Sequence, residues 1–270
     1  MSGGGPAAGL AEELVAAGLA GPVATTREQS LRSYRLFAAR DPRVLLGLDP
    51  YGEWRTADVV ALMAACCGVS ADPGCRTGAD VIDPVRTVAA LEGFAARLGR
   101  AARLRERVLL GTGHPRRLHG FYAAVADALS AAGCAVLTPA QGRRVDITTR
   151  FGLRRHRIAY VRGVAMVLGE GVREAACFGA HSHSPLPVRV ALAAAAEGLP
   201  DLVVGDHGWV CGAGQLGFDA IGLADTDDPA LFVGQAEGRV AAVVPLDDAV
   251  PSHRYRPLTR YVLNRARLSQ

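Results

Sequence analysis

The hydrophobic positions divide the chain into two parts with different periodicity. Up to about residue 106, apolar residues recur at helical spacing, and the pattern predicts helices over about 7–19, 27–41, 57–67 and 84–105. Beyond residue 106, short continuous apolar runs alternate with amphipathic stretches. Such runs are typical of strands that are buried on both faces of a parallel sheet.

The second part begins with a predicted strand–helix–strand unit. "RVLLGTGHP" and "CAVLTP" are its strands, and "RRLHGFYAAVADALSAAG" is the helix between them. "DLVVGD", "AIGLADTDDP" and "RVAAVVPLDD" predict three further buried strands, and the segment 143–169 predicts one or two strands or a hairpin. The sequence therefore predicts an α/β fold. Residues 107–270 form an open, mostly parallel sheet with flanking helices, and a helical N-terminal part (1–106) packs on it within one continuous domain.

The first chemically suggestive turn follows the strand that ends near residue 111. Gly111, Thr112 and Gly113 allow close backbone approach, and the following helix offers free amides. With Arg116 nearby, this turn is a candidate phosphate site, and His114 within it is a candidate catalytic residue. The alternative is an ordinary tight turn.

A pair of histidines stands in a loop at His181 and His183. Alternate residues of an extended segment point the same way, so both imidazoles are candidate metal ligands. The alternative is a polar loop in which the rings bond to backbone carbonyls.

The strongest candidate is the pair Asp206 and His207, at the end of a buried strand. These side chains can transfer protons or bind a metal ion. The glycines around them would leave room for a small charged group; these are Gly205, Gly208, Gly212 and Gly214. The alternative is a turn in which Asp206 caps the next segment.

A cluster of carboxylates follows the next strand at Asp225, Asp227 and Asp228. Clustered carboxylates repel one another unless a cation is near, so Asp225 and Asp227 are candidate ligands for Mg²⁺ or a similar divalent ion. The alternative is a solvated turn that caps a helix at Pro229. Asp247 and Asp248 repeat the pattern more weakly.

These candidates share one geometric expectation. Ligands of open parallel sheets bind beyond the carboxyl ends of the strands. We therefore expect the tips after Leu110, Val204 and Ala224 to meet around one charged ligand.

Composition narrows the chemistry. All 30 basic side chains are Arg, which excludes a Schiff-base lysine and a P-loop lysine. The net charge of +4 is modest and the basic residues are scattered, so we expect no nucleic-acid partner. We also expect no membrane span, no export signal and no disulfides, hence a cytoplasmic protein; the sequence assigns no oligomeric state.

Several longer segments together resemble a family of actinobacterial phosphatases. The similarity covers nearly the whole chain, and its motifs are "PVATTREQSLRSYRLFAARDPRVLLGLDP", "LLGTGHP", "VLTPAQGRRVDITTRFG", "YRPLTRYVLNRA" and the stretch 203–248. The resemblance implies a phosphate-ester substrate without assigning roles to residues.

The sequence thus favours a phosphatase that hydrolyses a small phosphorylated substrate, with metal assistance. One alternative is a module that binds a nucleotide or phosphosugar without chemistry. The other is a lyase or isomerase that acts on a phosphorylated or carboxylated small molecule.

Overall fold

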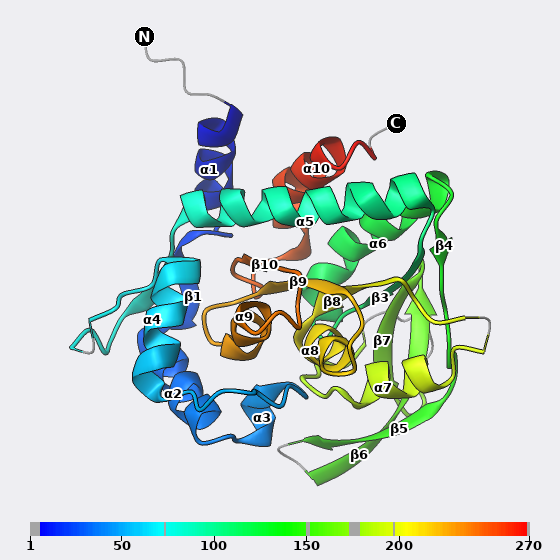
Figure 1. Ribbon diagram of the computed structural model, residues 1–270, viewed down its shortest axis with the longest axis horizontal. Coiled ribbons are helices and arrows are strands. Elements are labelled where there is room, and N and C mark those ends of the chain that lie inside the picture. Colours follow the sequence, from blue (N-terminus) through cyan, green and yellow to red (C-terminus); the bar gives the residue numbers. More distant parts are fainter. Residues whose placement is uncertain (1–5, 73, 150–151, 173–178, 197, 269–270) are drawn as a thin grey trace.

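The protein is a three-layer α/β structure (Figure 1). The computed structural model describes residues 6–72, 74–149, 152–172, 179–196 and 198–268. A central eight-stranded sheet has helices packed on both of its faces. The predicted fold class is confirmed.

The central sheet is parallel over most of its width. Its strand order is β10-β9-β8-β3-β7-β6-β5, and β4 pairs with β3 beside this path. The strands from β10 to β7 run parallel, whereas β6 and β5 continue the sheet as an antiparallel meander that projects at one corner in Figure 1. The strand bounds are β3 (Arg107–Gly111), β4 (Ala135–Val136), β5 (Arg144–Thr149), β6 (Gly152–Val161), β7 (Val164–Gly169), β8 (Leu202–Asp206), β9 (Ala220–Ala224) and β10 (Ala242–Pro245).

The helices divide between the two faces of the sheet. One face carries α1, α5, α6 and α10, and the other carries α2, α4, α7, α8 and α9. Their bounds, with the short α3 and the 3₁₀ helix η2, are α1 (Pro6–Ala16), α2 (Arg27–Ala38), α3 (Pro42–Leu45), α4 (Thr56–Cys67), α5 (Pro84–Leu104), α6 (Pro115–Ala131), α7 (Leu186–Ala193), α8 (His207–Gln215), α9 (Pro229–Ala236), η2 (Ser252–Tyr255) and α10 (Arg256–Arg265).

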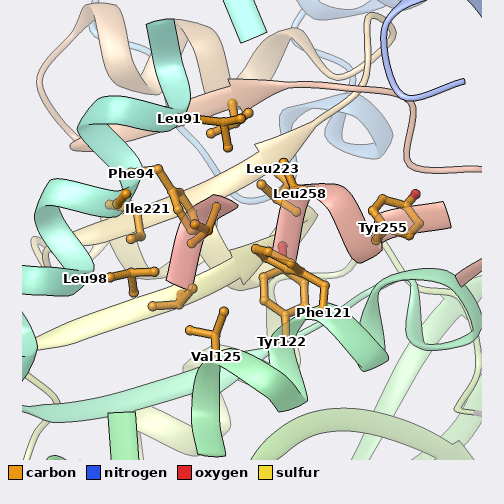
Figure 2. Packing of buried hydrophobic residues seen from close by; sticks show 14 of the residues in the cluster. Leu91, Phe94, Leu98, Phe121, Tyr122, Val125, Ile221, Leu223, Tyr255 and Leu258 are labelled. Atoms are coloured by element: carbon orange, nitrogen blue, oxygen red, sulfur yellow. The ribbon is translucent and has the colours of Figure 1, made fainter. Parts of the chain in front are cut away.

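Side-chain alternation along the strands produces the two core layers. In β3, Val108 and Leu110 enter the layer beneath α5 and α6, whereas Leu109 enters the opposite layer. Figure 2 shows the first layer, where Phe94 of α5 and Phe121 of α6 lie with their ring centroids 6.2 Å apart. Burial on both faces explains why these strands are continuous apolar runs rather than alternating ones.

The N-terminal part is not purely helical, contrary to the expectation for residues 1–106. Strands β1 (Gly21–Thr26) and β2 (Ala79–Ile82) form a separate antiparallel pair. Each is half-buried and pairs with a partner far away in sequence, so local periodicity gives only a weak signal. Both core layers contain residues from 1–106 and from 107–270. One continuous domain stays the prediction.

No helix in the described part of the chain has the length and apolar character needed to cross a membrane.

Candidate active site

Three helices begin directly after three neighbouring strands of the parallel sheet. α6 follows β3 at Pro115, α8 follows β8 at His207, and α9 follows β9 at Pro229. Their positive N-terminal ends therefore face the carboxyl edge of the sheet, where a loop after β10 joins them. The expected meeting of the strand tips is observed: Thr112 contacts Asp206, and His207 contacts Asp228.

His207 lies at the centre of this edge. Its Nε2 lies 2.9 Å from Asp228 Oδ2 and 3.5 Å from Asp248 Oδ2, and its side chain is only 2% exposed. Its φ of 45° is left-handed, which makes the turn from β8 into α8 sharp. Burial lowers the pKa of His207, but Asp228 and Asp206 outweigh burial, so the pKa lies well above its usual value.

Asp206 holds His207 in place. Its Oδ2 accepts a hydrogen bond from Thr112 Oγ1 and its Oδ1 accepts one from the Gly113 amide, both at 2.6 Å. Oδ1 also lies 3.1 Å from His207 Nδ1. Burial raises the pKa of Asp206, but His207 and Thr112 lower it by a larger amount. The pKa therefore lies below its usual value, and the group is ionised. Both oxygens of Asp206 are thus engaged within the protein, and Oδ1 faces His207; the metal-ligand role predicted from the sequence stays a prediction.

The glycines around this pair make room for protein, not for a ligand. A Cβ at Gly113 would lie 2.2 Å from Ser182 O, and one at Gly208 would lie 2.4 Å from Ser184 O. Gly205, Gly212 and Gly214 likewise face other chain segments. Small residues therefore let the histidine loop and the strand ends approach closely, which corrects the expectation of a ligand-sized space.

The amides of the Gly111–His114 turn are also already used. Thr112 N donates to Ala165 O at 2.9 Å, Gly113 N donates to Asp206, and His114 N donates to Thr112 Oγ1 at 3.0 Å. This turn is therefore not a vacant phosphate cradle as predicted. Arg116 is exposed on the first turn of α6, and its predicted phosphate contact stays a prediction.

The acidic loop after β9 contains carboxylates in three different states. Burial, together with Asp248, raises the pKa of Asp225 well above its usual range. Burial, together with Asp228, raises the pKa of Asp227 to about 7. At Asp228 burial acts in the same direction, but His207 outweighs it and the pKa falls to about 2.

The N-terminal part fixes this acidic loop through buried hydrogen bonds. Thr25 Oγ1 donates to Asp225 Oδ2 at 2.6 Å, Ser30 Oγ lies 3.0 Å from Thr226 Oγ1, and Tyr34 Oη donates to Thr226 O at 2.8 Å. Sequence reasoning missed these residues, because nothing local distinguishes them from other helix and strand positions.

The loop after β10 contributes one structural and one site carboxylate. Asp247 accepts hydrogen bonds from Ala24 N at 2.7 Å and Ala249 N at 2.8 Å, which ties β1 to the sheet. Asp248 instead points into the site, with Oδ2 3.1 Å from His114 Nδ1. The weakest acidic signal in the sequence thus supplies a central group.

Three further imidazoles face His207 from the solvent side. His114 and His181 are stacked with centroids 4.0 Å apart, and the Nε2 atoms of His181 and His183 lie 3.0 Å apart. His181 and His183 are exposed on one side. Loss of hydration on the inner side, followed by the neighbouring imidazoles, lowers the pKa of His181 to about 3 and that of His183 to about 4. Both rings are neutral at pH 7, the form that binds metals.

The donor atoms fit a divalent ion. His207, Asp228 and Asp248 form one set whose ligand atoms lie within 4.8 Å of one another, and His114, His181 and His207 form another. Nδ1 of His114 and Nδ1 of His207 are buried without an aligned hydrogen-bond partner in the described structure, despite the short distances to carboxylates. Of the predicted ligands, His181 belongs to a set and His183 lies beside it, whereas Asp206, Asp225 and Asp227 belong to neither.

Cavity size does not mark this edge. A cavity of about 220 Å³, lined by Leu137, Pro139 and Ala195, lies at other loops. The chemistry of the converging side chains is the better guide to the site.

The fold and this edge define an α/β protein with a buried histidine–aspartate centre at the carboxyl ends of parallel strands. The chain matches the family model described as Phosphatase over residues 6–270, and it belongs to that family. It is also 44% identical over 264 residues to "Phosphatase SCO2771" of Streptomyces coelicolor, which covers 96% of this chain and 95% of that protein. The resemblance seen in the sequence is confirmed.

Proposed function

We propose that the protein is a phosphatase that hydrolyses small phosphate monoesters with the help of a divalent ion. The observation that carries this proposal is the buried set His207, Asp228 and Asp248 in a member of the Phosphatase family. The name of the Streptomyces relative supports the same activity.

Charge balance supports the metal. Asp206, Asp228 and Asp248 are all at most 5% exposed, and without an ion they surround one imidazolium at His207. Binding of a metal by Nε2 of His207 would release the proton on that nitrogen. No Arg forms an ion pair with these three carboxylates within the described residues. Buried charges need partners, and a divalent cation would offset the excess negative charge.

The reaction breaks the ester P–O bond and joins the phosphorus to a water oxygen, and the departing oxygen takes up a proton. A bound divalent ion supplies Lewis acidity, which neutralises phosphoryl charge and lowers the pKa of water. His207, Asp228 and Asp248 would hold the ion, and Asp206 would keep His207 oriented. The ester would enter from the side of His181 and His183, which is open to solvent.

The α6 N-terminus would assist phosphate binding. The helix begins at Pro115, and its positive end favours a dianion beside His114. Arg116 on the first turn adds a formal positive charge, which remains the predicted role of this residue.

The test is release of inorganic phosphate from an aryl and an alkyl phosphate monoester by the purified protein. Added Zn²⁺, Mn²⁺ or Mg²⁺ should support turnover, and a chelator should abolish it. Asp228→Asn should be inactive, whereas Asp201→Asn, at the other edge of the sheet, should remain active. A phosphodiester serves as the substrate-class control.

Other outcomes would identify another function. An ester that raises the melting temperature but stays intact would make the protein a binding module. Conversion of the ester without free phosphate would indicate a lyase or isomerase.

A further inference from the structure

The proposed single ion leaves three histidines without a role. His114, His181 and His183 come from two loops, yet their rings gather on the solvent side of His207. The centroid of His183 lies 4.3 Å from that of His207, and the centroid of His114 lies 4.6 Å from it. Core packing does not explain this gathering, because His181 and His183 are exposed.

Histidines elsewhere in the chain show what an ordinary structural ring does. His119 Nε2 lies 3.0 Å from Val161 O, and His156 Nδ1 lies 3.1 Å from Arg154 O. In the described structure no ring nitrogen of the four clustered histidines bonds to a backbone carbonyl; these nitrogens face one another or carboxylates. The alternative reading of the histidine loop, rings bonded to carbonyls, therefore does not hold.

Asp248 stands between the two groups of donors. Its Oδ2 lies 3.1 Å from His114 Nδ1 on one side and 3.5 Å from His207 Nε2 on the other. Donor atoms that bind one tetrahedral ion at about 2.0–2.2 Å lie about 3.3–3.6 Å apart. These separations, and the 3.0 Å between Nε2 of His181 and His183, are close to that spacing.

A second, independent observation points to a bound ion on the solvent side of His207. Nδ1 of His114, one of the outer rings, is buried without an aligned hydrogen-bond partner. Buried polar atoms in proteins are normally satisfied.

We propose that the site holds two neighbouring divalent ions. The inner ion is the one of the proposed function, on which this inference rests, and the outer ion is held by His114 and His181 with His183 beside them. Asp248 lies between the ions and contributes to both. The imidazole-rich outer set favours Zn²⁺ over Mg²⁺.

Two ions extend the proposed chemistry to a clamp. Ions about 3.5–4 Å apart stabilise both the attacking and the leaving oxygen of an in-line displacement. The exposed outer position places that clamp where a phosphoryl group arrives from solvent.

The experiment counts ions. Protein purified with Zn²⁺ is analysed for metal content, and the metal-free protein is titrated calorimetrically with Zn²⁺. The wild type should bind two equivalents. The His181→Ala/His183→Ala double variant should bind one, and Asp228→Asn should lose the inner equivalent. His253→Ala removes an exposed histidine outside the site and should keep two.

Electron paramagnetic resonance with Mn²⁺ tests adjacency. The wild type should show an exchange-coupled pair, and the double variant should show an isolated ion. Circular dichroism and melting temperature check folding, which the exposed positions 181 and 183 should not disturb.

One equivalent in the wild type, two retained by the double variant, or two uncoupled ions would each overturn the second site. Phosphate release measured in parallel separates the two proposals. Ester hydrolysis with a single ion keeps the proposed function and rejects the pair. Two coupled ions without hydrolysis keep the pair and reject the function.

Discussion

Charged side chains have different partners at the two edges of the parallel sheet. At the amino edge, two ion pairs lie at the starts of β3, β8 and β9: Arg107 with Asp201 at 3.0 Å, and Arg97 of α5 with Asp219 at 2.6 Å. At the carboxyl edge, the buried carboxylates of Asp206, Asp228 and Asp248 face histidines, hydroxyls and amides.

This difference in charge indicates that the ligand binds at the carboxyl edge. A guanidinium and a carboxylate balance each other's charge, and at the amino edge Arg107 pairs with Asp201 while Arg97 pairs with both Asp219 and Glu106. At the carboxyl edge, the three carboxylates outnumber the one imidazolium that they surround, at His207, so negative charge is left over. Strand direction places every such group at one edge, because each lies in the turn after a parallel strand.

We expect the largest difference in turnover between variants of one aspartate from each edge. Asp228→Asn removes a proposed metal ligand and should lower phosphate-ester turnover by on the order of 10³-fold. Asp201→Asn should leave turnover within about twofold, since its pair with Arg107 is distant from the chemistry. Steady-state kinetics on an aryl phosphate would decide, and equal losses in both variants would remove the functional distinction between the edges.

Removing metal should destabilise the protein through the carboxyl edge only. An ion present at about 1,000 times its dissociation constant stabilises the folded state by about 4 kcal/mol, or roughly 10 °C in melting temperature for a chain of this size. We expect chelation to cost that much in the wild type and in Asp201→Asn. Asp228→Asn should show a smaller chelator shift, because it lacks the inner ion; a chelator shift of full size in this variant would contradict the assignment.

A pH experiment addresses the unmatched charge directly. The pKa of Asp227 is raised from 3.8 to about 7, so the folded state holds a proton that the unfolded state releases. This contribution to stability is present below pH 4 and is lost as pH rises through 7. Metal-free Asp227→Asn should therefore be more stable than wild type at pH 8, by on the order of 1–3 kcal/mol, and similar near pH 4.

Urea unfolding at the two pH values measures this difference. Asp219→Asn is the control at the amino edge, where loss of the ion pair with Arg97 should destabilise the protein. Stabilisation of similar size in both variants would argue against excess charge as the cause.

Two matched tyrosine variants test the buried hydrogen bonds by which the N-terminal part fixes the acidic loop. Tyr34→Phe leaves Thr226 O without its donor, and Tyr160→Phe does the same to Pro139 O. Each should cost about 1–3 kcal/mol of stability. Only Tyr34→Phe should also weaken metal affinity, by about tenfold, because Thr226 lies in the loop of Asp228. Equal metal affinity in both variants, measured by titration, would show that the hydrogen bond from Tyr34 to the acidic loop has a purely structural role.

The smallest effect is expected for the stability of the amino edge. Arg107 and Asp201 side chains are 44% and 41% exposed, so their pair is well solvated. Asp201→Asn should shift the unfolding midpoint only slightly, and added salt should erase the shift. A large, salt-independent loss would show that this edge is not the passive one.

Local sequence signals predicted much of the fold. Thr26 caps α2 with a capping box to Gln29, Asp83 caps α5, and Gly68 ends α4 with φ of 81°. Each cap acts between residues a few positions apart, which is why local patterns predicted the ranges of these helices. The run after His207 was missed as a helix, because its glycines disfavour helix locally and are retained for close packing against Ser184 and other segments.

The features of the site likewise fall into those predicted from local sequence and those seen only in the structure. Sequence patterns were enough to predict that Asp206 and His207 end a buried strand, and that further histidines and carboxylates follow other buried strands. The tertiary structure was needed to show that both oxygens of Asp206 accept hydrogen bonds, that Asp248 lies beside His114 and His207 while Asp247 binds backbone amides, and that Tyr34 donates to the acidic loop. The physical reason is range: caps and strand periodicity act between near neighbours. The state and role of a carboxylate depend instead on burial and on partners that the chain brings in from far along its length.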